Sequence, residues 1–228
     1  MTEFILFAHR GASGHEPENT LRAFRRALES GAEWIELDVH AVEGEPVVFH
    51  DFHLDHRTNG TGPIGECTLE YIRSLDAGKG ERIPLLREVM AFLGGKAGVN
   101  VELKGPGTAD PTARVLAESL STPFWNPSRM LVSSFYLNAL ARFHALLPDV
   151  PIGALFAEPP PPLEPLKAGL NCTSVHIEKD SVSRETVEEA HSLGLRVFVY
   201  TVNEPDDAGR LRALGVDGIF SDFPERFL

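Results

Sequence analysis

Three acidic side chains occur at positions where they could hold a metal ion together. Glu36 and Asp38 lie two residues apart in the apolar segment EWIELDV (33–39), and Glu102 lies in the later segment NVELKG. In a β-strand, residues i and i+2 point to the same face, so Glu36 and Asp38 would project together. Burying like charges side by side is unfavourable unless a cation or strong hydrogen-bond donors neutralise them. Oxygen-only ligands suit a hard divalent cation, Mg²⁺ or Ca²⁺, with Mn²⁺ also compatible.

Two histidines end predicted strands near these acids. His9 closes the apolar run FILFAH (4–9), and His50 closes EPVVFH (45–50). A single histidine at a strand end is often structural. Two of them beside one metal ion would supply a general acid and a general base, because imidazole titrates with a pKa of about 6.5. We therefore predict that His9 and His50 act as a catalytic pair.

Two basic side chains add positive charge at the same ends of the predicted strands. Arg10 directly follows the strand 4–9, and Lys104 ends the strand 98–104. A guanidinium group matches the oxygens of a phosphate, and an ammonium group supplies a point charge. Either residue could instead pair with the nearby acids, and the two roles are compatible. The whole set favours metal-assisted attack on a phosphate ester over acyl transfer. Ser13 and Ser134 lack the sequence context of a serine-hydrolase nucleophile.

The elements that must position these residues alternate between short apolar runs and amphipathic helical patterns. Eight such runs in 228 residues fit a (β/α)₈ TIM barrel, and a doubly wound open sheet is the alternative. In a barrel the carboxyl ends of the strands meet at one rim, where the candidate residues would gather. The predicted strands are 4–9, 33–39, 98–104, 130–135, 152–156, 173–178, 195–202 and 217–222.

The run 45–50 departs from this alternation. Only about four residues separate it from the preceding strand, whereas a parallel crossover needs roughly a dozen, so it must return antiparallel as a hairpin. Residues 51–82, which are rich in turn-forming residues, are interpreted as a small lid-like insertion within a single domain spanning 1–228. Five apolar residues of the insertion would form either its own small core or a lipid-facing lid: Phe52, Leu54, Ile64, Leu69 and Ile72.

Charge and composition limit the partners. A formal net charge of −12 disfavours nucleic acid, because phosphate backbones attract basic surfaces. No stretch approaches the roughly 20 apolar residues of a membrane span, and the first residues, MTEFILFAHRG, do not resemble a secretion signal. Cys67 and Cys172 are too few for a disulfide framework. We expect a cytoplasmic monomer or homodimer with free thiols, in which the proline run 159–162 forms a stiff loop rather than a ligand for a partner.

Taken in order, these segments resemble the glycerophosphodiester phosphodiesterase family. Each fragment is weakly diagnostic alone, but together they extend over nearly the whole chain. The matching segments are HRG (9–11), PENT (17–20), ELDV (36–39), VVFHD (47–51), LDAG (75–78), IP-LREV (83–89), VELK (101–104), SSF (133–135), YTVN (200–203) and GVDGIFSDFP (215–224).

The resemblance implies a phospholipase-like barrel and a role in glycerophospholipid metabolism. Its substrate would be a small-molecule glycerophosphodiester, cleaved to sn-glycerol 3-phosphate and an alcohol such as choline or ethanolamine. Tyr200 stands where the family commonly has tryptophan, and Leu85 where it has threonine, which bears on the preferred alcohol or the core. Residue by residue, the resemblance implies metal ligands at Glu36, Asp38 and Glu102, acid and base at His9 and His50, phosphate contacts at Arg10 and Lys104, and Glu18 close to the site.

Three other functions remain open. An enolase-like metal-dependent lyase also gathers carboxylates at strand ends and could use Lys104 as its base, but it gives no reason for the paired histidines. A barrel that binds phosphate without catalysis would not need an acid and a base. A lysophospholipase D acting on lysolipids would use the same chemistry, with the insertion as its lipid-facing lid.

Overall fold

The structure, a computed structural model, describes residues 4–228 and forms nine β-strands in that range. Parallel pairing runs from the first strand through the ninth back to the second, and the first and second strands also pair, which closes a ring of eight. The predicted (β/α)₈ TIM barrel is therefore confirmed, and the open sheet is wrong. The strands are β1 (Ile5–Ala8), β2 (Trp34–Val42), β3 (Glu45–Val48), β4 (Gly98–Leu103), β5 (Met130–Ser134), β6 (Ile152–Phe156), β7 (Ser174–Glu178), β8 (Arg196–Tyr200) and β9 (Gly218–Ser221).

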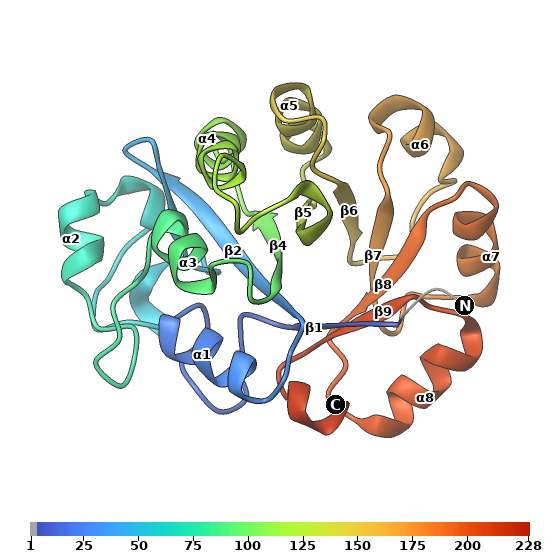
Figure 1. Ribbon diagram of the computed structural model, residues 1–228, viewed down its shortest axis with the longest axis horizontal. Coiled ribbons are helices and arrows are strands. Elements are labelled where there is room, and N and C mark those ends of the chain that lie inside the picture. Colours follow the sequence, from blue (N-terminus) through green and yellow to red (C-terminus); the bar gives the residue numbers. More distant parts are fainter. Residues whose placement is uncertain (1–3) are drawn as a thin grey trace.

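Amphipathic helices surround this ring of strands (Figure 1). The first begins after Thr20, whose Oγ1 accepts a hydrogen bond from the Ala23 amide at 3.2 Å and so caps the helix. Its buried face packs on the barrel through Ala23, Phe24 and Ala27. The helices are α1 (Leu21–Glu29), α2 (Leu69–Ser74), α3 (Leu86–Leu93), α4 (Ala109–Leu120), α5 (Leu137–Leu146), α6 (Glu164–Leu170), α7 (Arg184–Ser192) and α8 (Pro205–Leu214).

The strand β3 runs antiparallel to β2, as the short connection requires. Val39 pairs with Val48, and the Phe49 amide donates to the Asp38 carbonyl at 3.0 Å. The next residue, His50, therefore reaches the level of Glu36 and Asp38. This register brings the hairpin histidine to the carboxyl end of the barrel.

The insertion between β3 and α3 packs with the β2–β3 hairpin in a small apolar cluster that is separate from the main core. Leu54, Ile64 and Ile72 are buried in it together with side chains of the hairpin, and Leu69 is partly buried. Phe52 differs from the other four residues of the predicted group, because half of its surface is exposed and its ring meets the edge of His40 at 5.1 Å. The hairpin and the insertion thus share one core, with Phe52 outside it.

The interior of the barrel is filled by aromatic side chains beneath the rim. Phe7 stacks on Phe220 at a centroid distance of 4.5 Å, and it meets the edge of Phe198 at 5.0 Å. These rings, with Leu131, form a cluster separate from the larger core between strands and helices. The barrel is therefore a packed core with an open end rather than a pore.

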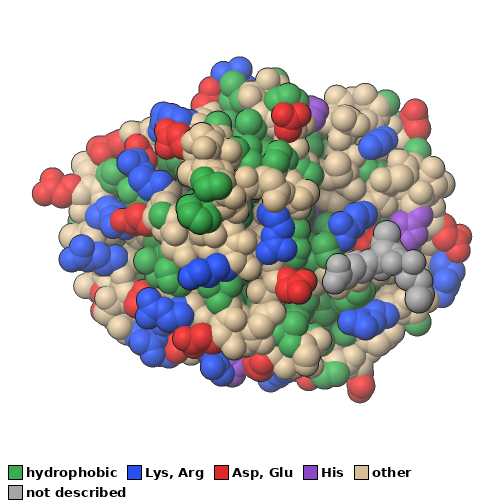
Figure 2. Space-filling view, viewed as in Figure 1, with side chains coloured by type: hydrophobic (Ala, Val, Ile, Leu, Met, Phe, Trp, Pro, Cys, Tyr) green, Lys and Arg blue, Asp and Glu red, His purple; other side chains and the backbone are tan. Residues whose placement is uncertain are grey.

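On the outer surface, basic and acidic side chains are interspersed over the face drawn in Figure 2. Among residues 4–228, no helix is both long and apolar enough to cross a membrane. Residues 1–3, on which part of the expectation about a secretion signal depends, lie outside the described range. Cys67 and Cys172 are both free thiols.

Candidate active site

Two neighbouring strands bring the three acidic candidates together. Asp38 on β2 is the register partner of Glu102 on β4, and Glu36 projects from the same face of β2. One oxygen from each carboxylate lies within 4.8 Å of the other two. All three side chains are buried, with 8% or less of their surface exposed. The alternation predicted from the sequence therefore produces a compact group of buried carboxylates.

Basic and amide donors surround this group. The Arg10 amide donates to Glu36 Oε2 at 2.8 Å, and Asn19 Nδ2 donates to Asp38 Oδ2 at 2.9 Å. Arg10 adopts a positive φ of 56°, which turns its amide toward β2 as the chain leaves the barrel. The turn continues through Gly11, where a side chain would collide with Ala23.

Lys104 completes the contacts of the carboxylates. Its Nζ lies 3.0 Å from Glu102 Oε1 and 3.8 Å from Asp38 Oδ1, and Arg10 Nε lies 3.4 Å from Asp38 Oδ2. Burial disfavours ionisation of Asp38, but Arg10 and Lys104 outweigh it and hold the pKa of Asp38 below its ordinary value. Asp38 is accordingly an anion with two basic neighbours.

The other two carboxylates shift in the opposite direction. Burial, together with the charges of Asp38 and Glu102, raises the pKa of Glu36 well above its ordinary value. Burial and the charge of Asp38 raise the pKa of Glu102 to about 7, although Lys104 opposes the shift. Two basic side chains therefore leave three buried carboxylates incompletely neutralised. A divalent cation would remove this electrostatic cost.

His9 is held by a residue from the far end of the chain. Its Nδ1 lies 2.7 Å from Asp222 Oδ1, just after β9. Asp222 also accepts hydrogen bonds from Ser13 Oγ at 2.9 Å and from Asn203 Nδ2 at 2.8 Å. Burial disfavours the charge of Asp222, yet the hydrogen bonds from His9, Asn203 and Ser13 lower its pKa far below the ordinary value. An ionised Asp222 accepts the Nδ1 proton of His9 and leaves Nε2 available for proton transfer.

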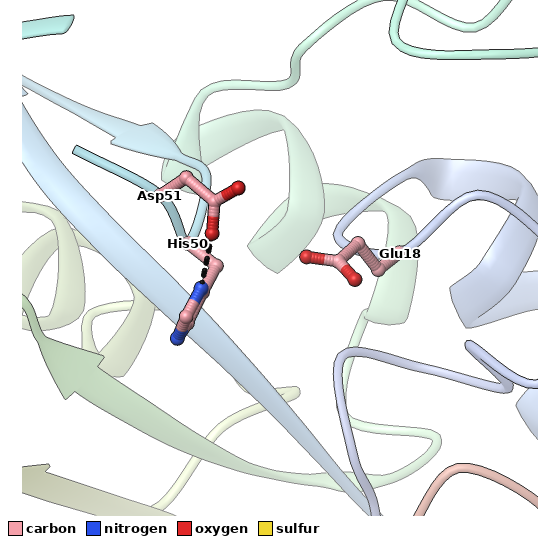
Figure 3. Close-up of side chains that lie close together, drawn as sticks. All are labelled: Glu18, His50 and Asp51. Carbon is pink, nitrogen blue, oxygen red and sulfur yellow. Dashed lines mark hydrogen bonds and ion pairs between the residues drawn. The ribbon is translucent and has the colours of Figure 1, made fainter. Parts of the chain in front are cut away.

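His50 has a carboxylate partner that is local in the sequence. Its Nδ1 lies 2.7 Å from Asp51 Oδ1, as the dashed line in Figure 3 marks. Burial lowers the pKa of His50, with the charges of Arg10 and Lys104 acting in the same direction. Figure 3 also shows the carboxylate of Glu18, carried by the segment before α1, facing toward this pair.

Within residues 4–228, two groups of acidic and histidine side chains have the geometry to hold an ion. In the first group, Glu18, His50 and Asp51, the carboxylate of Glu18 already has two basic partners. Arg10 Nη1 donates to Glu18 Oε1 at 2.9 Å, and Arg57 lies 3.3 Å from Glu18 Oε2. The group on β2 and β4 is fully buried, offers only oxygen ligands and carries uncompensated charge. Its donor set fits a hard divalent cation better.

A cavity of about 430 Å³ joins these features at the carboxyl ends of the strands. His9, Arg10, Glu36, His50, Glu102 and Lys104 all line it, as the sequence predicts for one site. Asp38 lies behind this wall, and Glu18 lines a neighbouring cavity beside the insertion. Asn100 on β4 and Phe220 on β9 also line the cavity. The remaining lining residues come from the side formed by β5 to β8 and are Phe135, Leu155, His176, Glu178, Tyr200 and Thr201.

Sequence reasoning missed several residues of the site. Asp222 carries the same signal as Glu36 and Asp38, a carboxylate at the end of an apolar strand in GIFSDF, and could have been found by the same rule. Asp51 directly follows a candidate histidine. Asn19 and Asn203 lie in loops, where no periodicity marks a side chain that turns toward the barrel.

The comparisons with known proteins agree with this geometry. Residues 9–226 match the Glycerophosphoryl diester phosphodiesterase family. The chain belongs to this family. A glycerophosphodiester phosphodiesterase of Caldanaerobacter subterraneus subsp. tengcongensis is 36% identical to it, over 98% of this chain and 96% of the relative. One from Bacillus altitudinis is 34% identical, over 97% of this chain and 95% of the relative.

A solved structure in the same family is similar over nearly its full length. The phosphodiesterase of Oleispira antarctica in complex with the product sn-glycerol-3-phosphate superposes with a TM-score of 0.90 at 33% identity, over 97% of this chain and 94% of that one. The family resemblance and the enzyme class predicted from the sequence, a glycerophosphodiester phosphodiesterase, are confirmed.

Proposed function

We propose that the protein hydrolyses glycerophosphodiesters to sn-glycerol 3-phosphate and an alcohol, with His9 and His50 as its acid and base and a divalent cation as cofactor. The observation that carries this proposal is the convergence of two carboxylate-held imidazoles on one cavity with three buried carboxylates. The product bound to the relative from Oleispira antarctica supports the same reaction.

Proton transfer is the role proposed for the two histidines. One Nε2 removes the proton of the nucleophile, and the other Nε2 protonates the departing alcohol. The nucleophile is water, which gives sn-glycerol 3-phosphate directly, or the neighbouring hydroxyl of the glyceryl group, which gives a cyclic phosphate that water then opens to the same product. The phosphorus–oxygen bond to the alcohol breaks as the bond to the nucleophile forms. Asp222 and Asp51 hold both rings in the tautomer that exposes Nε2.

Arg10 and Lys104 are proposed to bind the phosphate. Both line the cavity beside the carboxylates, and burial together with these acids fixes their side chains. The charges of Glu102 and Asp38 outweigh the effect of burial and raise the pKa of Lys104, so it stays protonated at neutral pH. Positive charge positioned in advance stabilises the additional negative charge of the transition state.

The divalent cation would be held by Glu36, Asp38 and Glu102, and Mg²⁺ or Ca²⁺ is proposed, with Mn²⁺ compatible. When bound, it supplies Lewis-acid stabilisation of the negative charge on the phosphate. The protein's own part is to keep the three carboxylates together and dry on two adjacent strands.

The test is hydrolysis of glycerophosphocholine by His9→Ala and His50→Ala, measured as released sn-glycerol 3-phosphate. Loss of either proton-transfer group should reduce kcat by about 10³-fold or more, with the melting temperature nearly unchanged. His53→Ala, which removes an exposed histidine of the insertion, is the matched control. Near-wild-type turnover by either active-site variant contradicts the proposal.

The alternatives give different outcomes in the same assays. A lyase of the enolase kind would exchange a carbon-bound proton of its substrate without releasing glycerol 3-phosphate. A lysophospholipase D would prefer lysophosphatidylcholine to glycerophosphocholine. The burial of Leu54, Ile64 and Ile72 in the insertion's own cluster favours the water-soluble diester, because these residues are not free to face a lipid.

A further inference from the structure

The side of the cavity formed by β5 to β8 has no role in the reaction proposed above. Phe135 directly follows β5, while Glu178 and Tyr200 are the last residues of β7 and β8 and are register partners of each other. In Figure 1, β7 and β8 lie on the other side of the barrel from β2 and β4. All three side chains line the cavity that the candidate catalytic residues also line.

The two aromatic rings of this wall meet at a right angle. Phe135 and Tyr200 have centroids 6.2 Å apart and planes inclined by 89°, and Tyr200 meets Phe220 in the same way at 6.5 Å. The Tyr200 hydroxyl donates to the Phe156 carbonyl at 2.9 Å, so its hydrogen is already used. Aromatic faces attract a positive charge, and Lys104 Nζ already lies over the Phe135 ring, 6.0 Å from its centroid. The rings therefore present an aromatic surface to the cavity, with Tyr200 on the side of Phe135.

Glu178 adds a negative charge beside these rings. Its Oε2 accepts a hydrogen bond from the Asp180 amide at 2.6 Å, and it forms no ion pair with a basic side chain of residues 4–228. The adjacent Lys179 instead lies 3.8 Å from Asp207. This differs from the opposite wall, where the carboxylates are paired with Arg10 and Lys104. A carboxylate without a basic partner at a cavity wall is suited to a cationic ligand.

We propose that Phe135, Glu178 and Tyr200 bind the departing alcohol and select one that carries a quaternary ammonium group. This inference rests on the proposed phosphodiesterase function and assigns its substrate class. A substrate with a negative phosphate and a positive ammonium matches a cavity with Arg10 and Lys104 on one wall and Glu178 on the other. Methyl groups on the nitrogen would contact the ring faces of Phe135 and Tyr200, while the charge would be balanced by Glu178.

The experiment compares kcat/KM for glycerophosphocholine, glycerophosphoethanolamine and bis(glyceryl) phosphate, whose leaving group is neutral glycerol. The wild type should prefer choline to glycerol about tenfold, which is the effect of a partly desolvated cation–aromatic contact. Glu178→Gln and Phe135→Leu should each reduce this preference about three-fold or more. Glu158→Gln makes the same charge change on the exposed segment after β6, outside the cavity, and should keep the ratio.

The possible outcomes distinguish failure of the proposed alcohol selection from failure of the proposed phosphodiesterase function. Equal kcat/KM for choline and glycerol esters in the wild type, or an unchanged ratio in Glu178→Gln, overturns the selection. A rate for the ethanolamine ester equal to that for the choline ester overturns the assignment of a quaternary ammonium. Absence of glycerol 3-phosphate release from all three esters overturns the phosphodiesterase function itself, and the inference with it.

Discussion

On the side of the barrel mouth formed by β9, β1, β2 and β4, buried and half-buried carboxylates have basic or amide partners. Asp38 lies beside Arg10, Lys104 and Asn19, and Asp222 accepts several hydrogen bonds. On the side formed by β5 to β8, His176 is fully buried with Ser174 as its hydrogen-bond partner, and its Nδ1 has no partner within residues 4–228. The two sides thus treat ionisable groups in opposite ways.

This contrast shows how one cavity can serve two purposes. Ionised groups persist on the first side because partners offset the loss of hydration, and such groups can bind phosphate and transfer protons. On the second side burial alone lowers the pKa of His176 to about 3, so its ring stays neutral and packs between Phe198 and Phe220. That side is suited to contact rather than to chemistry.

The strongest test of the contrast is Asp222→Asn, on the side formed by β9, β1, β2 and β4, which we call the charged side. An amide cannot stabilise the imidazolium of His9 and can hold the wrong tautomer, so kcat should fall about 10³-fold with little change in melting temperature. Glu225→Gln is the matched control, because Glu225 makes a similar 2.6 Å contact with His15 on the surface. If both variants lose the same activity, the His9–Asp222 pair has no special role.

The second test separates the two candidate ion sites on that side. Adding Mg²⁺, Ca²⁺ or Mn²⁺ at about 100 times its dissociation constant should stabilise the chelator-treated protein by ~2.7 kcal/mol, which is several degrees in melting temperature. Asp38→Asn should lose this shift, whereas Asp51→Asn should retain it. The opposite pattern would assign the ion to Glu18, His50 and Asp51 instead.

The third and smallest effect concerns His176, on the side formed by β5 to β8. In the folded protein His176 has a pKa of about 3, far below the value of about 6.5 in an unfolded chain. Between these values the unfolded state binds the extra proton, so this contribution to stability is complete above pH 6.5 and is lost as the pH falls. The slope approaches ~1.4 kcal/mol per pH unit at most.

Denaturation of wild type and His176→Gln between pH 7 and pH 5 measures this contribution. As the pH falls, the free energy of unfolding of the wild type should decrease relative to that of His176→Gln, because glutamine does not titrate. His53→Gln, at an exposed position of the insertion, is the control. A constant difference between wild type and His176→Gln over this pH range contradicts the neutral burial of His176.

Local patterns in the sequence predicted much of the charged side. The alternation at Glu36 and Asp38 and the short connection before β3 depend on neighbours within a few residues, and they predicted a shared face and an antiparallel return. Which apolar residues of the insertion are buried was harder to predict. Phe52 has the composition of a core residue, but its ring packs against His40 and half of it remains exposed.

The sequence by itself determined the strands, their polar ends and the residue types at each end, because hydrophobic period and strand-end polarity are local properties. The tertiary structure alone decided which ends meet. His9 contacts Asp222, which is 213 positions away in the sequence, because β1 pairs with β9 when the barrel closes. The same closure brings Phe135, Glu178 and Tyr200 to the cavity that the carboxylates line, so the proposed contacts of the departing alcohol depend on how the whole sheet closes rather than on any single segment.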